Sequence, residues 1–293
     1  MSVQASDSAT ASSSAGWSAA RRGLADPLGR LGLAFVLLLF LAAIFADVIS
    51  GYEPTKMVPR DRFLNPSYEH LLGTDQLGRD LFSRMLHGGR VALMVAVPAI
   101  GISLMLGIFF GLIAGYAPKW LDNILLLLFD AIRSFPTVML ALALATIIGP
   151  SLYTVVLVVI LFSAPAYARI IRTQTLALRN AEFVLASVVT GASVWRVLGV
   201  HILPNILGPI LILVSMDLPV VITTEAGMSF LGLGVRPPTP SWGSILNDGY
   251  AYIRESPWMA IAGGLPIIVT TIGFTFLGEA LRDAYDPKLR HNG

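Results

Sequence analysis

Charged residues and cysteine are the side chains that this sequence most lacks. Only 13% of its 293 residues are charged and 55% are hydrophobic, whereas about 25% charged is usual for soluble globular domains. Too little charge is present to cover a water-soluble globule of this length, so the composition predicts an integral membrane protein. The absence of cysteine excludes disulfides and thiol chemistry. The formal net charge of +2 gives no indication of nucleic-acid binding.

Motifs for enzymatic chemistry are also missing. The sequence contains no G-x-x-x-x-G-K-[ST] phosphate loop, no H-E-x-x-H helix and no G-x-S-x-G elbow. His70 has no second histidine or cysteine at ligand spacing, which argues against a metal site. We therefore expect a non-catalytic chain that binds no cofactor or metal itself.

Long apolar runs are what the sequence does contain. About 20 apolar residues cross a bilayer core of roughly 30 Å, and six segments reach that length. The sequence thus predicts an all-α integral membrane protein with six transmembrane helices. The predicted spans are 31–49, 91–116, 121–148, 152–171, 202–230 and 258–281.

Positive charges predict the orientation of the chain. Arg21, Arg22 and Arg30 precede the first apolar run, which is longer than a signal-peptide core and lacks a convincing A-x-A site. We therefore expect a retained anchor with a cytoplasmic N-terminus, and the even number of spans predicts a cytoplasmic C-terminus. The expected divisions are a disordered tail over 1–27, a first transmembrane helix over 28–50, an extracytoplasmic connector over 51–90, a five-helix membrane core over 91–285 with a cytoplasmic loop over 172–201, and a cytoplasmic tail over 286–293.

The polar interruption from about Arg169 to Pro204 predicts a docking site for a cytoplasmic partner. Its local chemistry indicates two short helices, the first capped by Asn180 and ended by Gly191 in a left-handed turn. Ser193 can cap the second helix and Gly199 can end it, and Pro204 suits the first turn of the next one.

Ionisable residues inside the predicted spans allow two interpretations. Asp130 and Arg133 are spaced to pair with each other, although a proton relay is the alternative. Asp217 and Glu225, with the neighbouring Met216, are candidates for a translocation path that contacts a cationic cargo. The two acids could equally bond to backbone groups freed by nearby prolines.

Two other patterns predict packing rather than chemistry. In the connector, Thr74 or Asp75 can cap a helix, and Asp80 and Arg84 can pair along it. In the second span, a stripe of glycines at i,i+4 spacing predicts the close approach of another helix. The glycines are Gly107, Gly111 and Gly115.

Four motifs follow one another along the chain. Three of them are LGTDxxGRDxxSR over 72–84, SFLGLGVxPPxPSWG over 229–243, and LRDxxDPxxR over 281–290. The fourth is the run over 182–205, with Ala186, Gly191, Leu203 and Pro204 at fixed spacing. Together they resemble the motifs of permease subunits of ABC importers for dipeptides, oligopeptides and nickel. Residues 182–205 resemble the EAA loop of these permeases, with Leu185 where a glutamate is usual and Ser187 where the second alanine is usual.

The resemblance implies the type I ABC importer permease (MetI-like) fold with cytoplasmic coupling helices, in a bacterial inner membrane. It implies a heterodimer with a homologous permease subunit, two ATP-binding subunits that hold ATP and Mg, and an extracytoplasmic solute-binding protein. The implied ATPase-coupling residues are Glu182, Phe183, Ala186, Gly191, Ala192, Ser193, Leu203 and Pro204. The candidate docking residues for the binding protein are Arg236, Pro238, Ser241 and Trp242.

The implied function is ATP-driven import of short peptides, with this chain forming half of the pathway. Nickel complexes, glutathione or oligosaccharides are alternative cargoes of the same architecture. A different class of function is an ion-coupled secondary transporter that uses Asp130, Asp217 or Glu225, and a passive membrane scaffold is a third.

Overall fold

A computed structural model of the protein describes residues 26–285. In this part of the chain the regular structure is entirely helical, apart from an isolated antiparallel bridge between Thr74 and Asp80. Most of the tail expected over 1–27, the tail expected over 286–293, and the second half of the LRDxxDPxxR motif lie outside the described residues.

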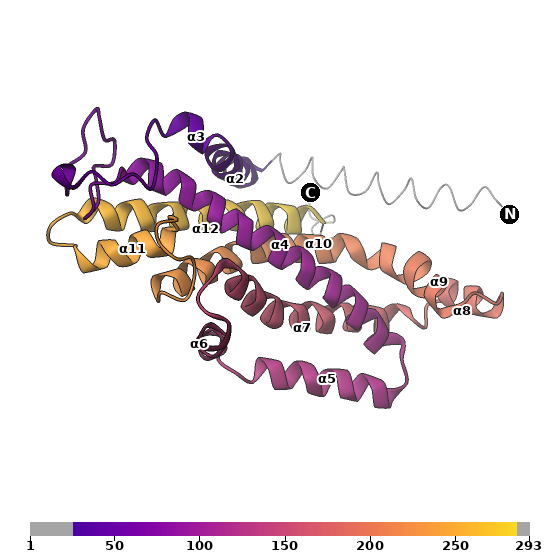
Figure 1. The fold of residues 1–293 in the computed structure, drawn as a ribbon. Helices are drawn as coiled ribbons and strands as arrows, with labels where there is room; N and C mark the ends of the chain where they lie inside the picture. Colours follow the sequence, from indigo (N-terminus) through magenta and orange to yellow (C-terminus); the bar gives the residue numbers. More distant parts are fainter. Residues whose placement is uncertain (1–25, 286–293) are drawn as a thin grey trace.

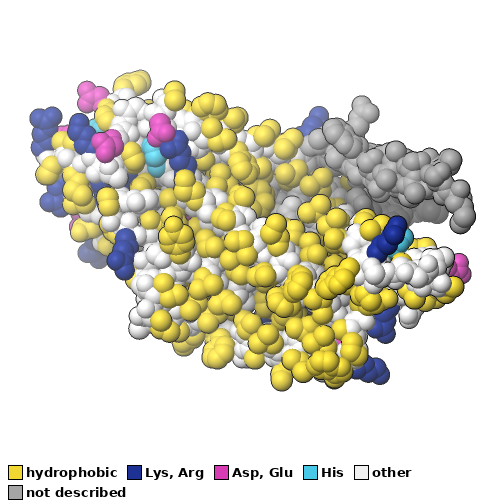
Figure 2. All heavy atoms as spheres, turned by 45° about the vertical axis from the view of Figure 1, so that its right-hand side comes forward, with side chains coloured by type: hydrophobic (Ala, Val, Ile, Leu, Met, Phe, Trp, Pro, Cys, Tyr) yellow, Lys and Arg dark blue, Asp and Glu magenta, His cyan; other side chains and the backbone are white. Residues whose placement is uncertain are grey.

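Five of the helices in the described residues are long and apolar enough to cross a membrane. They form one bundle with the shorter elements at its two ends (Figure 1). Hydrophobic side chains cover the middle of the face in Figure 2, and charged side chains gather toward the two ends, as in a multi-pass membrane protein. The long helices are α2 (Pro27–Ile44), α4 (Leu81–Tyr116), α7 (Leu152–Leu178), α10 (Leu203–Phe230) and α12 (Pro257–Tyr285).

The short elements distinguish the two ends of the bundle. One end, here called the connector end, holds α3 (Ala46–Ile49), the 3₁₀ turn η1 (Pro59–Asp61) and α11 (Trp242–Ala251). The opposite end, here called the α8 end, holds α8 (Glu182–Val189) and α9 (Val194–Arg196).

Side-chain caps determine where several long helices begin. Asp26 accepts a hydrogen bond from the backbone N–H of Gly29 at 3.1 Å, immediately before Pro27 opens α2. Asp80 accepts one from the N–H of Ser83 at 2.6 Å, so α4 begins at Leu81, well before the predicted start at residue 91.

The predicted third span is not one straight helix. It is divided into α5 (Lys119–Arg133) and α6 (Thr137–Ile148), which are bent by 83° relative to each other. Pro136 lies in the break, where its ring and its missing N–H end the preceding helix. Counting the bent pair as one crossing gives up to six spans.

The glycine stripe of α4 packs against α7, which confirms the close approach predicted from the sequence. A Cβ atom added at Gly107 would lie 2.5 Å from the Cβ atom of Tyr167, and one at Gly115 would lie 2.5 Å from that of Thr175. Separations this short leave no room for a side chain, so the absence of Cβ atoms allows the two helices to touch.

Glycines of α12 make the same kind of contact with two other helices. A Cβ atom added at Gly263 would lie 2.6 Å from the backbone nitrogen of Leu246 in α11, and one at Gly273 would lie 2.7 Å from the Cβ atom of Phe35 in α2. α12 therefore packs against α11 near the connector end and against α2 farther along its length (Figure 1).

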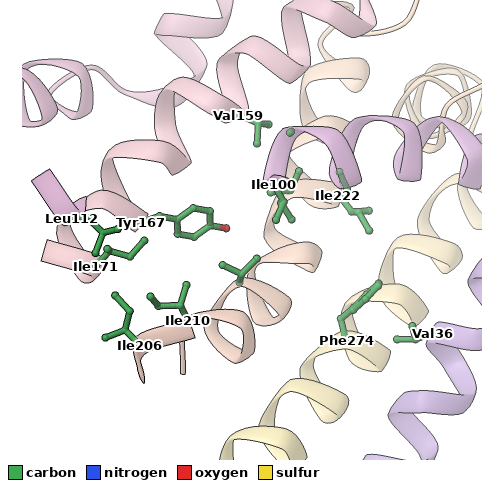
Figure 3. Packing of buried hydrophobic residues seen from close by; sticks show 14 of the residues in the cluster. Val36, Ile100, Leu112, Val159, Tyr167, Ile171, Ile206, Ile210, Ile222 and Phe274 are labelled. Atoms are coloured by element: carbon green, nitrogen blue, oxygen red, sulfur yellow. The ribbon is translucent and has the colours of Figure 1, made fainter. Parts of the chain in front are cut away.

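The main hydrophobic core joins α2, α4, α7, α10 and α12. Figure 3 shows Tyr167 and Ile171 of α7 beside Ile206 and Ile210 of α10, and Phe274 of α12 beside Val36 of α2. These contacts place α10 between α7 and α12.

Candidate functional site

A protrusion at the α8 end is the first candidate site, and it contains α8 and α9 (Figure 1). Ala181, rather than Asn180, is the N-cap residue of α8, and no side chain caps the helix, so the predicted cap is wrong. The helix ends at Val189, and Gly191 adopts a φ angle of 86°, which confirms the predicted left-handed turn.

The second predicted short helix is continuous with a long one. It begins after Ser193 as α9, continues through a π-helical segment η2 (Val197–Ile202), and leads into α10 without a break. The prediction that Gly199 ends this helix is therefore wrong. Pro204 does lie in the first turn of α10, and the π-helical segment precedes this proline, which has no N–H to donate.

Buried aliphatic side chains anchor the protrusion to the bundle. Val184 of α8 and Val197, Leu198 and Ile202 of η2 are all buried and belong to the main core. α8 packs against η2, and η2 continues into α10, so α8 contacts the segment that leads directly into α10.

The protrusion also exposes apolar side chains, together called the α8–α9 apolar surface. Val189 is 87% exposed and Trp195 is 68% exposed. Exposed apolar patches are typical of sites that contact another protein or a membrane. The surface consists of Phe183, Leu185, Val188, Val189, Val194 and Trp195.

The structure brings the coupling residues expected from the sequence together on this protrusion and the start of α10. Ala192 and Leu203 are partly buried against the core. The others are exposed, namely Glu182, Phe183, Ala186, Gly191, Ser193 and Pro204.

The three residues expected to line a path lie on α10 but face different surroundings. Asp217 is half-buried near the hydroxyl of Tyr167 in α7. Met216 packs against α12, where a Cβ atom added at Gly278 would lie 2.6 Å from its Cγ atom. Glu225 is 0% exposed and accepts a hydrogen bond from the Ser229 hydroxyl at 2.7 Å.

Two arginines of α7 pair with two aspartates of α5. Arg172 donates from Nη2 to Oδ2 of Asp122 at 2.6 Å and from Nε to Oδ1 of the same residue. Arg169 pairs with Asp130, so the predicted pair of Asp130 with Arg133 is wrong. Sequence reasoning missed both pairs, although two arginines one turn apart on α7 and two acids on the preceding span were a usable signal.

A buried ionic network holds the connector. Asp75 accepts from Arg79 Nε at 2.6 Å and lies 3.4 Å from Arg84 Nε. Asp80 caps α4 and lies 2.9 Å from Nδ1 of His70. The predicted pairing of Asp80 with Arg84 is therefore wrong, because Asp75 takes that place.

A second cluster joins α3 to α4 at the connector end. Asp47 lies 2.8 Å from Nη2 of Arg90 and 2.9 Å from Nε2 of His87. Hydrogen bonds from Arg90 and then His87 lower the pKa of Asp47 to about 2. The charged carboxylate is thus the form that holds the cluster together.

The four residues expected to receive a binding protein are divided between surface and interior. Arg236 and Pro238 are exposed. Ser241 caps α11 and is buried, and Trp242 is 2% exposed with its indole N–H donating to the backbone oxygen of Met85 at 2.8 Å. Of these four residues, only Arg236 and Pro238 are exposed for contact with a partner, because the indole ring of Trp242 packs between α11 and α4.

Comparison with known proteins supports the importer interpretation. Residues 107–291 match the family described as binding-protein-dependent transport system inner membrane component. Residues 14–66 match the N-terminal transmembrane domain of oligopeptide transport permease C.

Relatives of similar length cover most of the chain. A dipeptide transport system permease protein of Alkalihalophilus pseudofirmus is 36% identical over 90% of this chain and 87% of its own length. A di/tripeptide transport system permease protein of Pseudomonas aeruginosa is 37% identical over 89% and 88%. A glutathione transport system permease protein of Pectobacterium atrosepticum is 40% identical over 87% and 85%. The chain therefore belongs to the binding-protein-dependent transport family and is a membrane-spanning, non-catalytic permease subunit of an ABC importer.

Proposed function

We propose that this permease subunit forms half of a pathway for short peptides and is driven by ATPase subunits that bind the α8–α9 apolar surface. Exposure of this surface beyond the membrane-spanning bundle is the observation that supports the proposal most directly. Two ATP-binding subunits would hold ATP and Mg, a homologous permease subunit would complete the pathway, and a solute-binding protein would deliver cargo from the other side.

Arginines next to the first span favour a cytoplasmic location for the α8 end. Arg30 lies in the first turn of α2, and Arg172, Arg179 and Arg196 lie toward the same end, whereas the basic residues of the connector over 51–90 are nearly matched by acidic ones. The start of α2 lies at the same end, because Gly32 contacts α12 near Leu277. Both termini would then be cytoplasmic, and the connector end would face the binding protein.

A rigid helical connection supplies the mechanism. ATP binding would close the ATPase subunits and displace α8, which packs on η2. Because α9, η2 and α10 are continuous, that displacement would tilt α10 and change the side of the membrane to which the pathway opens. Such a shift requires the ATPase to bind the protrusion differently in the two states, since equal binding shifts no equilibrium.

Peptide cargo is supported by the names of relatives. The relatives transport dipeptides, di- and tripeptides, and glutathione, which is itself a small peptide. Asp217 is a half-buried carboxylate on α10 that suits a peptide amine. Nickel complexes and oligosaccharides remain the alternative cargoes.

Gly191 offers the sharpest test of coupling. Proline fixes φ near −65°, which is incompatible with the φ of 86° at this position, so Gly191→Pro should misplace the apolar surface. A bulky Ala186→Trp change should obstruct it directly. The variants are co-expressed with the neighbouring gene products, purified in nanodiscs, and assayed for ATPase activity and for peptide uptake after reconstitution.

We expect both variants to insert and assemble but to lose uptake while ATP hydrolysis persists. Gly101→Ala is the control, because Gly101 lies inside α4, away from the protrusion, and a Cβ atom there would meet nothing within 4 Å. Full uptake by both Gly191→Pro and Ala186→Trp would refute a coupling role for the protrusion.

A further inference from the structure

A cavity of about 280 Å³ opens at the connector end, apart from the protrusion and from Asp217. The connector, the first turn of α4, the end of α10, the loop over 232–239 and the start of α11 all contribute to its wall. Its size suits a small ligand or the end of a longer one.

Positive charge dominates the lining of this cavity. Arg79, Arg84 and Arg236 line it together with a single carboxylate from Asp248. The side chains of Arg79 and Arg84 are only 4% and 3% exposed. Buried charges are costly unless they are paired, so each guanidinium should have a partner.

Within residues 26–285, the neighbouring carboxylates do not balance these three arginines. Arg79 and Arg84 share the buried Asp75, which lies 2.6 Å from one and 3.4 Å from the other. Asp248 lies 3.7 Å from Arg79, which therefore has two acidic neighbours. Within residues 26–285, Arg236 has no carboxylate at ion-pair distance, and its Nε donates to the backbone oxygen of Pro150 at 2.9 Å.

Gln76, which lines the cavity, carries an unused hydrogen-bond acceptor. Its Oε1 atom is buried and has no partner in the described part of the chain. Buried polar atoms are normally hydrogen-bonded, so this oxygen indicates a donor that residues 26–285 do not supply. A backbone N–H of a peptide is such a donor, and it adjoins the terminal carboxylate unless the last residue is proline; a rotation of the Gln76 side chain would bring Oε1 to it.

We propose that this cavity binds the C-terminal carboxylate of a short peptide in passage. Arg84 and Arg236 would bind the carboxylate, because guanidinium groups present paired N–H donors that match it. Gln76 would accept from the adjacent peptide N–H. The identification of the carboxylate bearer as a peptide rests on the proposed function and on the connector end facing outward.

The test uses the absence of cysteine from the chain. Thr239 lines the cavity and is exposed, so Thr239→Cys places a single thiol at its rim. The assembled complex in nanodiscs is labelled with a maleimide in the presence of Ala-Ala or Ala-Ala amide, without binding protein or ATP. Labelling of this chain is followed by mass spectrometry.

We expect Ala-Ala with its free carboxylate to slow labelling of the thiol. Ala-Ala amide should need a roughly tenfold higher concentration for the same effect, because hydrogen bonds to a charged carboxylate are stronger than those to a neutral amide. The preference should disappear in Arg236→Gln but persist in Arg60→Gln, a matched arginine on the connector whose side chain is 87% exposed. A thiol at Tyr68→Cys, on the open surface of the connector, should be labelled equally in all conditions.

Equal protection by the acid and the amide, or protection by neither, would overturn the inference. Protection by purified binding protein alone, without any effect of peptide, would overturn it too and assign the cavity to docking. ATP-driven uptake of Ala-Ala into vesicles is measured in parallel. Uptake that persists while protection fails rejects only this site, whereas protection without uptake supports the site and counts against the proposed cargo.

Discussion

Arg172 of α7 binds Asp122 of α5 through two hydrogen bonds between one guanidinium and one carboxylate. The pair joins helices that are separated by the bend at Pro136 and by the whole of α6. Within α5 only Phe129 is buried, so apolar packing alone holds this helix weakly. The more buried pair of Arg172 with Asp122 therefore contributes more to holding α5 on α7 than the exposed pair of Arg169 with Asp130 does.

Replacing the guanidinium of Arg172, which donates two hydrogen bonds, by the single ammonium of lysine should loosen the packing of α5. We expect Arg172→Lys to destabilise the purified subunit by about 1.5–3 kcal/mol, the range for hydrogen bonds to charged groups, and at the lower end because both side chains are partly exposed. Thermal unfolding in detergent measures the change. Arg60→Lys is the control, because its pair with Asp61 is exposed and such pairs contribute at most about 1 kcal/mol. Equal losses in the two variants would contradict the assigned role.

These ion pairs show one limit of prediction from the sequence. Pairing by i,i+3 spacing favoured Asp130 with Arg133, and it assumed a straight helix through residue 136. The bend at Pro136 leaves α5 as a separate helix, and Asp130 pairs across space with Arg169. Local spacing cannot predict a contact that depends on how two helices are placed by the rest of the fold.

A substitution at Gly111 should separate α4 from α7. A Cβ atom there would lie 2.6 Å from the backbone oxygen of Ala168, which cannot move without moving α7. We expect Gly111→Leu to cost at least about 1–3 kcal/mol, the usual range for overpacking, and to abolish assembly of the complex. Gly101→Leu is the matched control in the same helix, since nothing lies within 4 Å of its added Cβ atom. The yield and size-exclusion profile of the two variants are compared. Normal assembly of Gly111→Leu would contradict the prediction, because it would show that the interface between α4 and α7 can accommodate a side chain.

The glycine stripe illustrates what the sequence does predict. Spacing of i,i+4 indicated a helix contact, and the structure identifies α7 as the partner. The left-handed turn at Gly191 was likewise predictable, because a helix end favours glycine there. The burial of Trp242 was not predictable from the sequence, because an indole next to a run of prolines is equally typical of a membrane interface. Only the packing of α11 against α4 decides between a buried and an interfacial indole.

Acid should release α3 from α4. The pKa of Asp47 is lowered to about 2 from its ordinary value of 3.8, so folding favours its charged form. Its contribution to stability is therefore complete above about pH 4 and is lost as the pH falls toward 2. Asp47→Asn should remove this part of the acid dependence and leave the profile above pH 5 unchanged in shape. Thermal unfolding of both proteins is measured between pH 2 and 7. The same loss of stability below pH 4 in both proteins would contradict the role given to Asp47.

Glu225 distinguishes ATP-driven transport from ion-coupled transport. Its carboxylate is enclosed by the chain and accepts from the Ser229 hydroxyl. Glutamine keeps an oxygen that can accept the same bond, so Glu225→Gln should preserve the fold and most ATP-driven uptake. Glu225→Leu removes the acceptor and leaves the buried Ser229 hydroxyl without it, which should cost about 1–3 kcal/mol. A transporter that moves protons through this acid would instead lose uptake in both variants.

The measurement for Glu225 compares uptake into reconstituted vesicles with ATP and with a proton gradient alone. We expect uptake only with ATP, in the unmodified protein and in Glu225→Gln. Thr224→Val is a matched control on the same helix, because its hydroxyl bonds only to the backbone oxygen of Val220 one turn earlier. Uptake driven by the gradient alone, and abolished by Glu225→Gln but not by Thr224→Val, would replace the ATP-driven mechanism with an ion-coupled one.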